Sequence, residues 1–67
     1  MTLHEAIITI LEQRDGLTTS EIATAINSEN LYTRNDQAPL NASQISARIS
    51  QYKHLFIRKN RKIYLKN

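Results

Sequence analysis

Four cations gather around one short turn near the end of the chain, in the stretch FIRKNRKIYL. Apolar residues close both sides of this stretch, and its centre consists of Arg58, Lys59, Asn60, Arg61 and Lys62. Like charges this close repel one another, so the arrangement does not help the chain to fold. Arginine and lysine clusters are suited to phosphate groups. We therefore expect this turn to contact an anionic partner outside the protein.

The charges of the chain are divided between its two halves. Residues 1–40 carry two cations and six acids, a net charge of −4, whereas residues 41–67 carry seven cations and no acid. This polarity favours an anionic partner for the second half. A solubilising surface is the alternative interpretation of such a run of charge.

Three capping-box patterns predict where three helices begin. In each pattern a capping residue stands three positions before a Glu or Gln and precedes apolar residues at helical spacing: Thr2 and Glu5, Thr18 and Glu21, Asn41 and Gln44. We expect helices over about residues 3–14, 19–29 and 42–53. Gly16, the single glycine, is placed to end the first of them.

The segments between and after these helices predict a loop and a hairpin. Residues 30–40 contain Asn35-Asp36 and Pro39, which break regular structure, while Leu31 and Tyr32 are expected to anchor the loop on the core. Residues 55–58 and 62–65 predict two short strands, with the turn near Lys59-Asn60.

This order of elements predicts the fold class. We expect a mainly α protein with a small β-hairpin, in which three helices and a two-stranded wing form one winged helix-turn-helix domain over residues 1–67. The domain is either free-standing or part of a larger protein.

The predicted helix 42–53 has one apolar face and one small, polar face. Ile45, Ile49 and Tyr52 lie within about 40° of one another on a helical projection. The opposite face has small side chains and no acid. In a winged helix this helix enters the major groove, where glutamine favours adenine. A solvated helix face is the alternative interpretation.

These considerations predict a surface that binds double-stranded DNA. Arg48 lies beside the apolar line, where it either reaches a phosphate or covers apolar surface with its stem. The predicted contacts from the third helix are Ser43, Gln44, Ala47, Arg48, Ser50, Gln51 and Lys53. Those from the wing, set against the backbone, are Arg58, Lys59, Asn60, Arg61 and Lys62.

The remaining chemistry of the sequence points to no catalytic, metal or cofactor site. The chain has no cysteine, and its two histidines are too few and too scattered for a metal site. We expect no enzyme activity, no cofactor and no small-molecule ligand. Tyr52 and Phe56 are expected in the core, whereas Tyr64 is open to a stacking role.

The N-terminus and the apolar runs of the chain indicate where in the cell the protein is expected. No apolar run approaches the length of a membrane span, and the N-terminus lacks the cationic start of a signal peptide. We expect an intracellular protein, in the cytoplasm and nucleoid of a bacterium or in the nucleus of a eukaryote.

Two stretches resemble a known family. AIITILEQRDGLTTSEIATAI is similar to the opening helix, turn and second helix start of HARE-type helix-turn-helix domains. ISARISQYKHLFIRKNRKIYLKN is similar to that family's third helix, basic turn and Tyr-apolar end. The resemblance covers nearly the whole chain. Its one departure is at the wing tip, where Asn60 stands at a position that is glycine in many members.

The resemblance implies a winged helix that serves another domain. The family occurs in restriction endonucleases, chromatin regulators and the bacterial RNA polymerase delta subunit. It implies DNA binding, with possible sensitivity to base modification, in restriction-modification or transcription regulation, next to a fused or associated nuclease or regulatory domain. The polymerase branch implies the alternative, a protein-interaction module that docks on an acidic surface. An exposed apolar patch around Leu31 and Tyr32 would favour that alternative.

Overall fold

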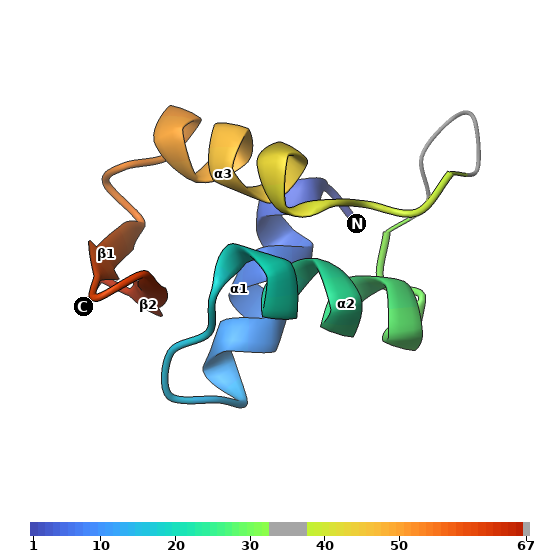
Figure 1. The fold of residues 1–67 in the computed structure, drawn as a ribbon, viewed down its shortest axis with the longest axis horizontal. Coiled ribbons are helices and arrows are strands. Elements are labelled where there is room, and N and C mark those ends of the chain that lie inside the picture. Colours follow the sequence, from blue (N-terminus) through green and yellow to red (C-terminus); the bar gives the residue numbers. More distant parts are fainter. Residues whose placement is uncertain (33–37, 67) are drawn as a thin grey trace.

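The computed structural model describes residues 1–32 and 38–66 and has the predicted winged helix-turn-helix plan. Figure 1 shows the hairpin beside the end of the third helix, and the first helix packs against both other helices and the second strand. The elements are α1 (Leu3–Glu12), α2 (Thr19–Glu29), α3 (Ala42–Gln51), β1 (Phe56–Lys59) and β2 (Lys62–Leu65).

All three predicted capping boxes are present. The side-chain oxygens of Thr2, Thr18 and Asn41 accept hydrogen bonds from the backbone N–H three residues on, at 3.3, 3.1 and 3.1 Å. In return, the side chains of Glu5, Glu21 and Gln44 accept from the N–H of the capping residue. The helix starts follow from local sequence because each box satisfies backbone donors that a helix start leaves free.

Two helices end earlier than predicted. α1 stops at Glu12 rather than at residue 14, because the next N–H groups turn to carbonyls three residues back: Gln13 to Ile10 and Arg14 to Leu11. α3 stops at Gln51 rather than at residue 53, since Tyr52 leaves the helical region with φ −121° and ψ 46°. Lys53, predicted on the third helix, therefore lies in the turn after it.

The core is built mainly from isoleucine. Six isoleucines have no significant solvent exposure, and they come from every helix and from β2: Ile7, Ile10, Ile22, Ile26, Ile45 and Ile63. Phe56 is also buried, as expected. Leu31, Tyr32 and Tyr52 pack against this core as half-buried side chains. The one core thus joins the hairpin to the helices.

The hairpin has a two-residue turn whose position differs slightly from the prediction. Lys59 pairs with Lys62, so the turn residues are Asn60 and Arg61, and β1 runs over Phe56–Lys59 rather than 55–58. β2 matches the prediction. The pairing places Arg58 and Ile63 on the inner face and Ile57 and Tyr64 on the outer face.

Leu17 joins the sheet through an isolated bridge that the sequence did not predict. Its N–H donates to the Ile63 carbonyl at 3.2 Å, and the Ile63 N–H donates to the Leu17 carbonyl at 2.7 Å. Just before it, Gly16 has φ +80°, and a side chain there would overlap the ring of Tyr64. Glycine is therefore required by conformation and by space.

The side chain of Asn27, on α2, holds the backbone of Leu40, which stands just before α3. Asn27 donates to the Leu40 carbonyl and accepts from the Leu40 N–H, both at 3.0 Å. The predicted breaker Asn35-Asp36 lies outside the described residues. Leu31 and Tyr32 lie on the core, as predicted for the loop anchors.

The Asn27 contact predicts a stability loss on truncation. Asn27→Ala would leave both backbone groups of Leu40 without their partner in a partly buried place, which lowers the free energy of unfolding by about 1–3 kcal/mol. Urea denaturation measures the change. The exposed neighbour Ser28 supplies the control, since Ser28→Ala should change the free energy of unfolding by less than about 0.5 kcal/mol. Equal losses in the two variants would contradict the role of Asn27.

The two acidic capping boxes predict a loss of stability in acid. Hydrogen bonds from the backbone and side chain of Thr2 hold the pKa of Glu5 below its ordinary value of 4.5. Those from Thr18, with a smaller contribution from Lys62, do the same for the pKa of Glu21. A lowered folded pKa stabilises the protein above the ordinary value, and this contribution is lost as pH falls through the folded pKa.

Replacing both acids should therefore flatten the acid side of the stability profile. Glutamine keeps the capping hydrogen bond without titrating, so Glu5→Gln/Glu21→Gln should lose less melting temperature than the wild type between about pH 5 and pH 3. Circular dichroism melts across this range measure the slope. Glu12→Gln, outside any capping box, is the control and should retain the wild-type slope.

Candidate nucleic-acid interface

None of the predicted contact residues is buried. Gln44 and Arg48 are half-buried, and the other ten are exposed: Ser43, Ala47, Ser50, Gln51, Lys53, Arg58, Lys59, Asn60, Arg61 and Lys62. The half-buried state of Arg48 fits a stem that covers apolar surface beside Ile45 and Ile49. The predicted contacts therefore all have surface available to a partner.

A hydrogen bond joins the wing to α3. The Arg58 guanidinium donates to the Ser46 hydroxyl at 3.0 Å, across 12 positions of sequence. A hollow of about 280 Å³ lies between these elements and is lined by Ile49, Ser50, Lys53, Phe56 and Arg58. The helix and the wing thus form one continuous surface, which is the arrangement expected of a DNA-binding winged helix. Ser46 was not among the predicted contacts.

The first turn of α3 is neutral, unlike those of the other helices. Its capping box uses Asn41 and Gln44, whereas α1 and α2 use Glu5 and Glu21. No acid therefore stands where this helix end would meet a phosphate. The Gln44 carbonyl oxygen accepts from the Asn41 N–H, which folds this side chain back onto the start of the helix. Gln51 is exposed and makes no side-chain hydrogen bond within the described residues.

The wing turn holds its cations against two unfavourable local effects. Lys59 and Lys62 are directly paired across the strands, and like charges in that position destabilise a hairpin. Asn60 and Arg61 both have positive φ, 53° and 68°, as in the turn that usually takes Asn-Gly. Arg61 therefore occupies the position that glycine favours. The resemblance to HARE-type domains had instead indicated Asn60 as the residue that replaces the glycine of many members.

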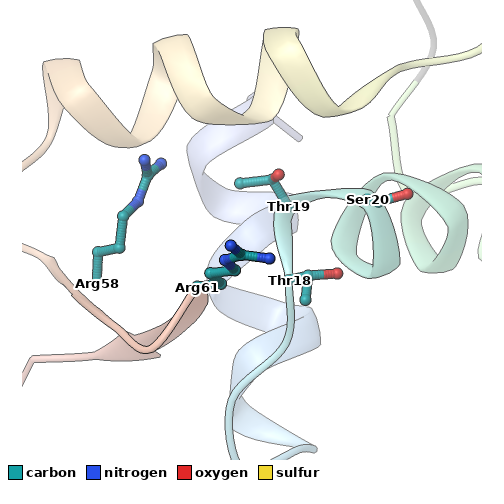
Figure 2. Close-up of a pocket in the computed structure, with 5 residues that line it drawn as sticks. All are labelled: Thr18, Thr19, Ser20, Arg58 and Arg61. Carbon is teal, nitrogen blue, oxygen red and sulfur yellow. The ribbon is translucent and has the colours of Figure 1, made fainter.

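A second hollow separates the wing from the start of α2. It measures about 410 Å³ and is lined by Thr18, Thr19, Ser20, Arg58 and Arg61. Figure 2 shows the guanidinium of Arg61 extending toward Thr18, and that of Arg58 extending toward α3. The sequence indicated the Thr18 cap but not this neighbourhood, because only the fold brings residues 40 positions apart together.

The aromatic side chains are occupied within the fold. Tyr52 stacks on His4 with ring centroids 4.2 Å apart, and His54 lies tilted on it at 6.1 Å. The Tyr64 ring lies against Gly16 and is half-buried. Phe56 is in the core. A stacking role for Tyr64, left open by the sequence, would therefore have only its outward surface available.

Neither a metal cluster nor a membrane-spanning helix is found in the described part of the chain. Residues 1–32 and 38–66 contain no group of three or more His, Asp or Glu side chains placed to hold a metal ion. Within the same ranges, no helix is long and apolar enough to cross a membrane.

Comparison with protein families identifies the domain. The model of the HARE-HTH family, a helix-turn-helix domain whose description names ASXL and restriction endonuclease, matches residues 1–67. The chain belongs to the HARE-HTH family. No curated protein and no solved structure matches the chain. The family is a helix-turn-helix family, and such domains generally bind DNA.

The strained turn predicts that one substitution stabilises this HARE-HTH domain. Glycine adopts positive φ freely, which favours the folded state, although it loses more entropy on folding than arginine does. The first effect is the larger, so Arg61→Gly should raise the free energy of unfolding by about 0.5–1 kcal/mol. Thermal or chemical denaturation measures the change. Arg61→Ala is the matched control, since it removes the same charge but keeps the unfavourable conformation. If both variants gain equally, charge repulsion rather than backbone strain limits the turn.

Proposed function

We propose that this HARE-HTH domain binds double-stranded DNA, with α3 in the major groove and the wing on the sugar-phosphate backbone. The observation that carries the proposal is the Arg58–Ser46 hydrogen bond. This hydrogen bond joins the wing to α3, so that the small, polar side chains of α3 and the cations of the wing can face the same partner. Residues 41–67 contribute seven cations and no acid to this half of the chain.

The cations of the wing do not stabilise the fold, which supports a contact with the DNA backbone. Its cations make no ion pair within the described residues, and the Lys59–Lys62 pair opposes hairpin formation. A DNA backbone would neutralise this repulsion and release counterions at the same time. An anionic ligand would explain why the wing carries cations that destabilise its own hairpin.

The face of α3 supports modest sequence specificity. Gln51 is free to pair with a base edge, whereas the carbonyl of Gln44 is held in the helix cap. The cap fixes the orientation of the Gln44 side chain, which leaves it less free than Gln51 to align with adenine. We therefore propose that affinity comes mostly from phosphates, with a small contribution from base contacts.

The family description suggests the wider setting. The HARE-HTH description names restriction endonuclease. We propose that the domain delivers DNA affinity to a nuclease or regulatory domain, fused or associated, and that base modification influences its binding. A duplex carrying modified bases, compared with the same unmodified duplex, tests the last point.

Removal of two wing-tip charges tests the proposed function. Lys59→Gln/Lys62→Gln should weaken binding to a mixed-sequence duplex and reduce the slope of log K against log salt by about 2, from a wild-type slope of about −4 to −5 for five phosphate contacts. Fluorescence anisotropy at several salt concentrations measures both quantities. The variant should fold at least as well as the wild type, because it removes a repulsive pair.

A control with the same net charge separates local contact from overall charge. Arg14→Gln/Lys66→Gln also removes two cations, but neither lies at the wing tip, and the salt slope should change by less than about 1. Equal slopes for the two double variants would remove the wing from the mechanism. Wild-type protein that fails to bind duplex would favour the alternative, a protein-docking module.

That alternative has one structural feature in its support. Leu31 and Tyr32 pack on the core and form no exposed apolar patch, but Ile57 on the outer face of the wing is 44% exposed. A single exposed apolar side chain is common on protein surfaces. DNA binding therefore remains the function that the site supports best.

A further inference from the structure

We propose that an extended, acidic segment of a partner protein adds a strand to the hairpin along the open edge of β1. The proposal goes beyond DNA binding and does not depend on it. It rests on an edge whose backbone groups have no partner among the described residues, on an exposed isoleucine at that edge, and on a hollow with a cationic rim beside it. Each of these features indicates a property of the partner.

β1 has one paired edge and one open edge. Leu17 is bridged to the far side of β2, and within residues 1–32 and 38–66 no strand or bridge adjoins the other side of β1. Both backbone groups of Ile63 bond Leu17 and therefore face away from β1. Directly opposed residues of an antiparallel pair turn their backbone groups either both toward each other or both away. The N–H and C=O of Arg58, opposite Ile63, therefore face the open edge.

Ile57 gives the open edge an apolar contact. It lies on the outer face of the hairpin, opposite Tyr64, and is 44% exposed. Because the backbone groups alternate along the strand, those of Ile57 face β2, and an added strand would meet this residue at a non-hydrogen-bonded position. Opposed side chains lie closest at such positions. The partner strand is therefore expected to place an apolar residue opposite Ile57.

A hollow beside the edge favours acidic residues on the other face of the added strand. It measures about 280 Å³ and is lined by Ile49, Ser50, Lys53, Phe56 and Arg58. Residues of an added strand opposite Phe56 and Arg58 would project on the same face as these two side chains, toward the hollow. Ile49 and Phe56 are buried and apolar, whereas Lys53 and Arg58 are exposed cations. A glutamate fits this combination, with its methylene groups on the apolar wall and its carboxylate on the cations.

The charge of the edge distinguishes a partner segment from a second copy of the domain. Lys53, Arg58 and Lys59 lie along β1 or just before it, and residues 41–67 contain no acid. Pairing with a second β1 would bring these cations together, and lysine on an edge strand opposes such self-pairing. An acidic strand makes the same charges attractive. Because Lys53 and Arg58 also belong to the proposed DNA-binding surface, a bound strand and a duplex would compete.

A short synthetic peptide tests the edge directly. The probe is Thr-Glu-Glu-Val-Glu-Val-Thr, blocked at both ends, in which the first valine is designed to lie opposite Ile57 and the second glutamate opposite Arg58. It should slow hydrogen exchange of the Arg58 N–H by about ten-fold or more at saturation, because this amide would gain a hydrogen bond. Two-dimensional NMR of the labelled domain measures both the exchange and the affinity.

Matched controls separate strand pairing from general attraction of charge. The same peptide, methylated at the backbone nitrogen of its second glutamate, keeps every charge but loses the donor to the Arg58 carbonyl, and it should bind about ten-fold more weakly. Ile57→Thr should weaken binding of the probe about five-fold, since it removes apolar contact but keeps a β-branched residue. Ile57→Val keeps the apolar contact and should bind within about two-fold of the wild type. Circular dichroism verifies the fold of both variants.

The outcomes decide what occupies the edge of β1. Slowed exchange at Arg58, together with weaker binding by Ile57→Thr, would support the added strand. Equal affinity of the methylated peptide, or shifts at the cations without slowed exchange, would indicate attraction of charge alone and overturn it. A probe that does not bind would overturn it as well. Slowed exchange in the free domain that increases with protein concentration would assign the edge to a second copy and also overturn the proposal.

Discussion

The paired hydrogen bonds between Leu17 and Ile63 are the constraint on which the proposed DNA-binding surface depends. They attach β2 to the segment between α1 and α2, while the Ile63 side chain is fully buried in the core. The hairpin register then places Arg58 on the inner face, within reach of α3. Gly16 is part of the same arrangement, since a side chain there would displace Tyr64.

The charges that support folding lie in a different half of the chain from those of the proposed DNA-binding surface. Acids support folding in the first half, where Glu5 and Glu21 close their capping boxes and Glu29 pairs with Arg14. The second half, residues 41–67, contains no acid, and the capping box of α3 uses Asn41 and Gln44 instead. Its cations oppose hairpin formation at the wing tip, and Arg61 has a positive φ that glycine would adopt more easily. In so small a domain the stability margin is narrow, so these unfavourable elements point to a ligand.

Helix starts were predictable because their determinants are local. A capping residue and its partner stand three positions apart, and all three boxes form as the sequence indicated. The end of α2 at Glu29 was also as predicted, but the ends of α1 and α3 were not. At the end of α3, Tyr52 leaves the helical region and stacks on His4, a residue 48 positions away. The turn was predicted one residue early because both Lys59-Asn60 and Asn60-Arg61 suit a tight turn by sequence. The core register of Ile63 decided between them.

The sequence by itself determined the order of elements, the apolar face of each helix and the concentration of cations after residue 40. These features depend on the spacing and composition of residues, which the sequence shows directly. Only the tertiary structure decided that Arg58 donates to Ser46 and that Arg58 and Arg61 line one hollow with the start of α2. Contacts between positions 12 and 40 residues apart depend on the packing of a shared core and on strand register. No local pattern encodes either of these, because many pairings satisfy the same alternation of residues.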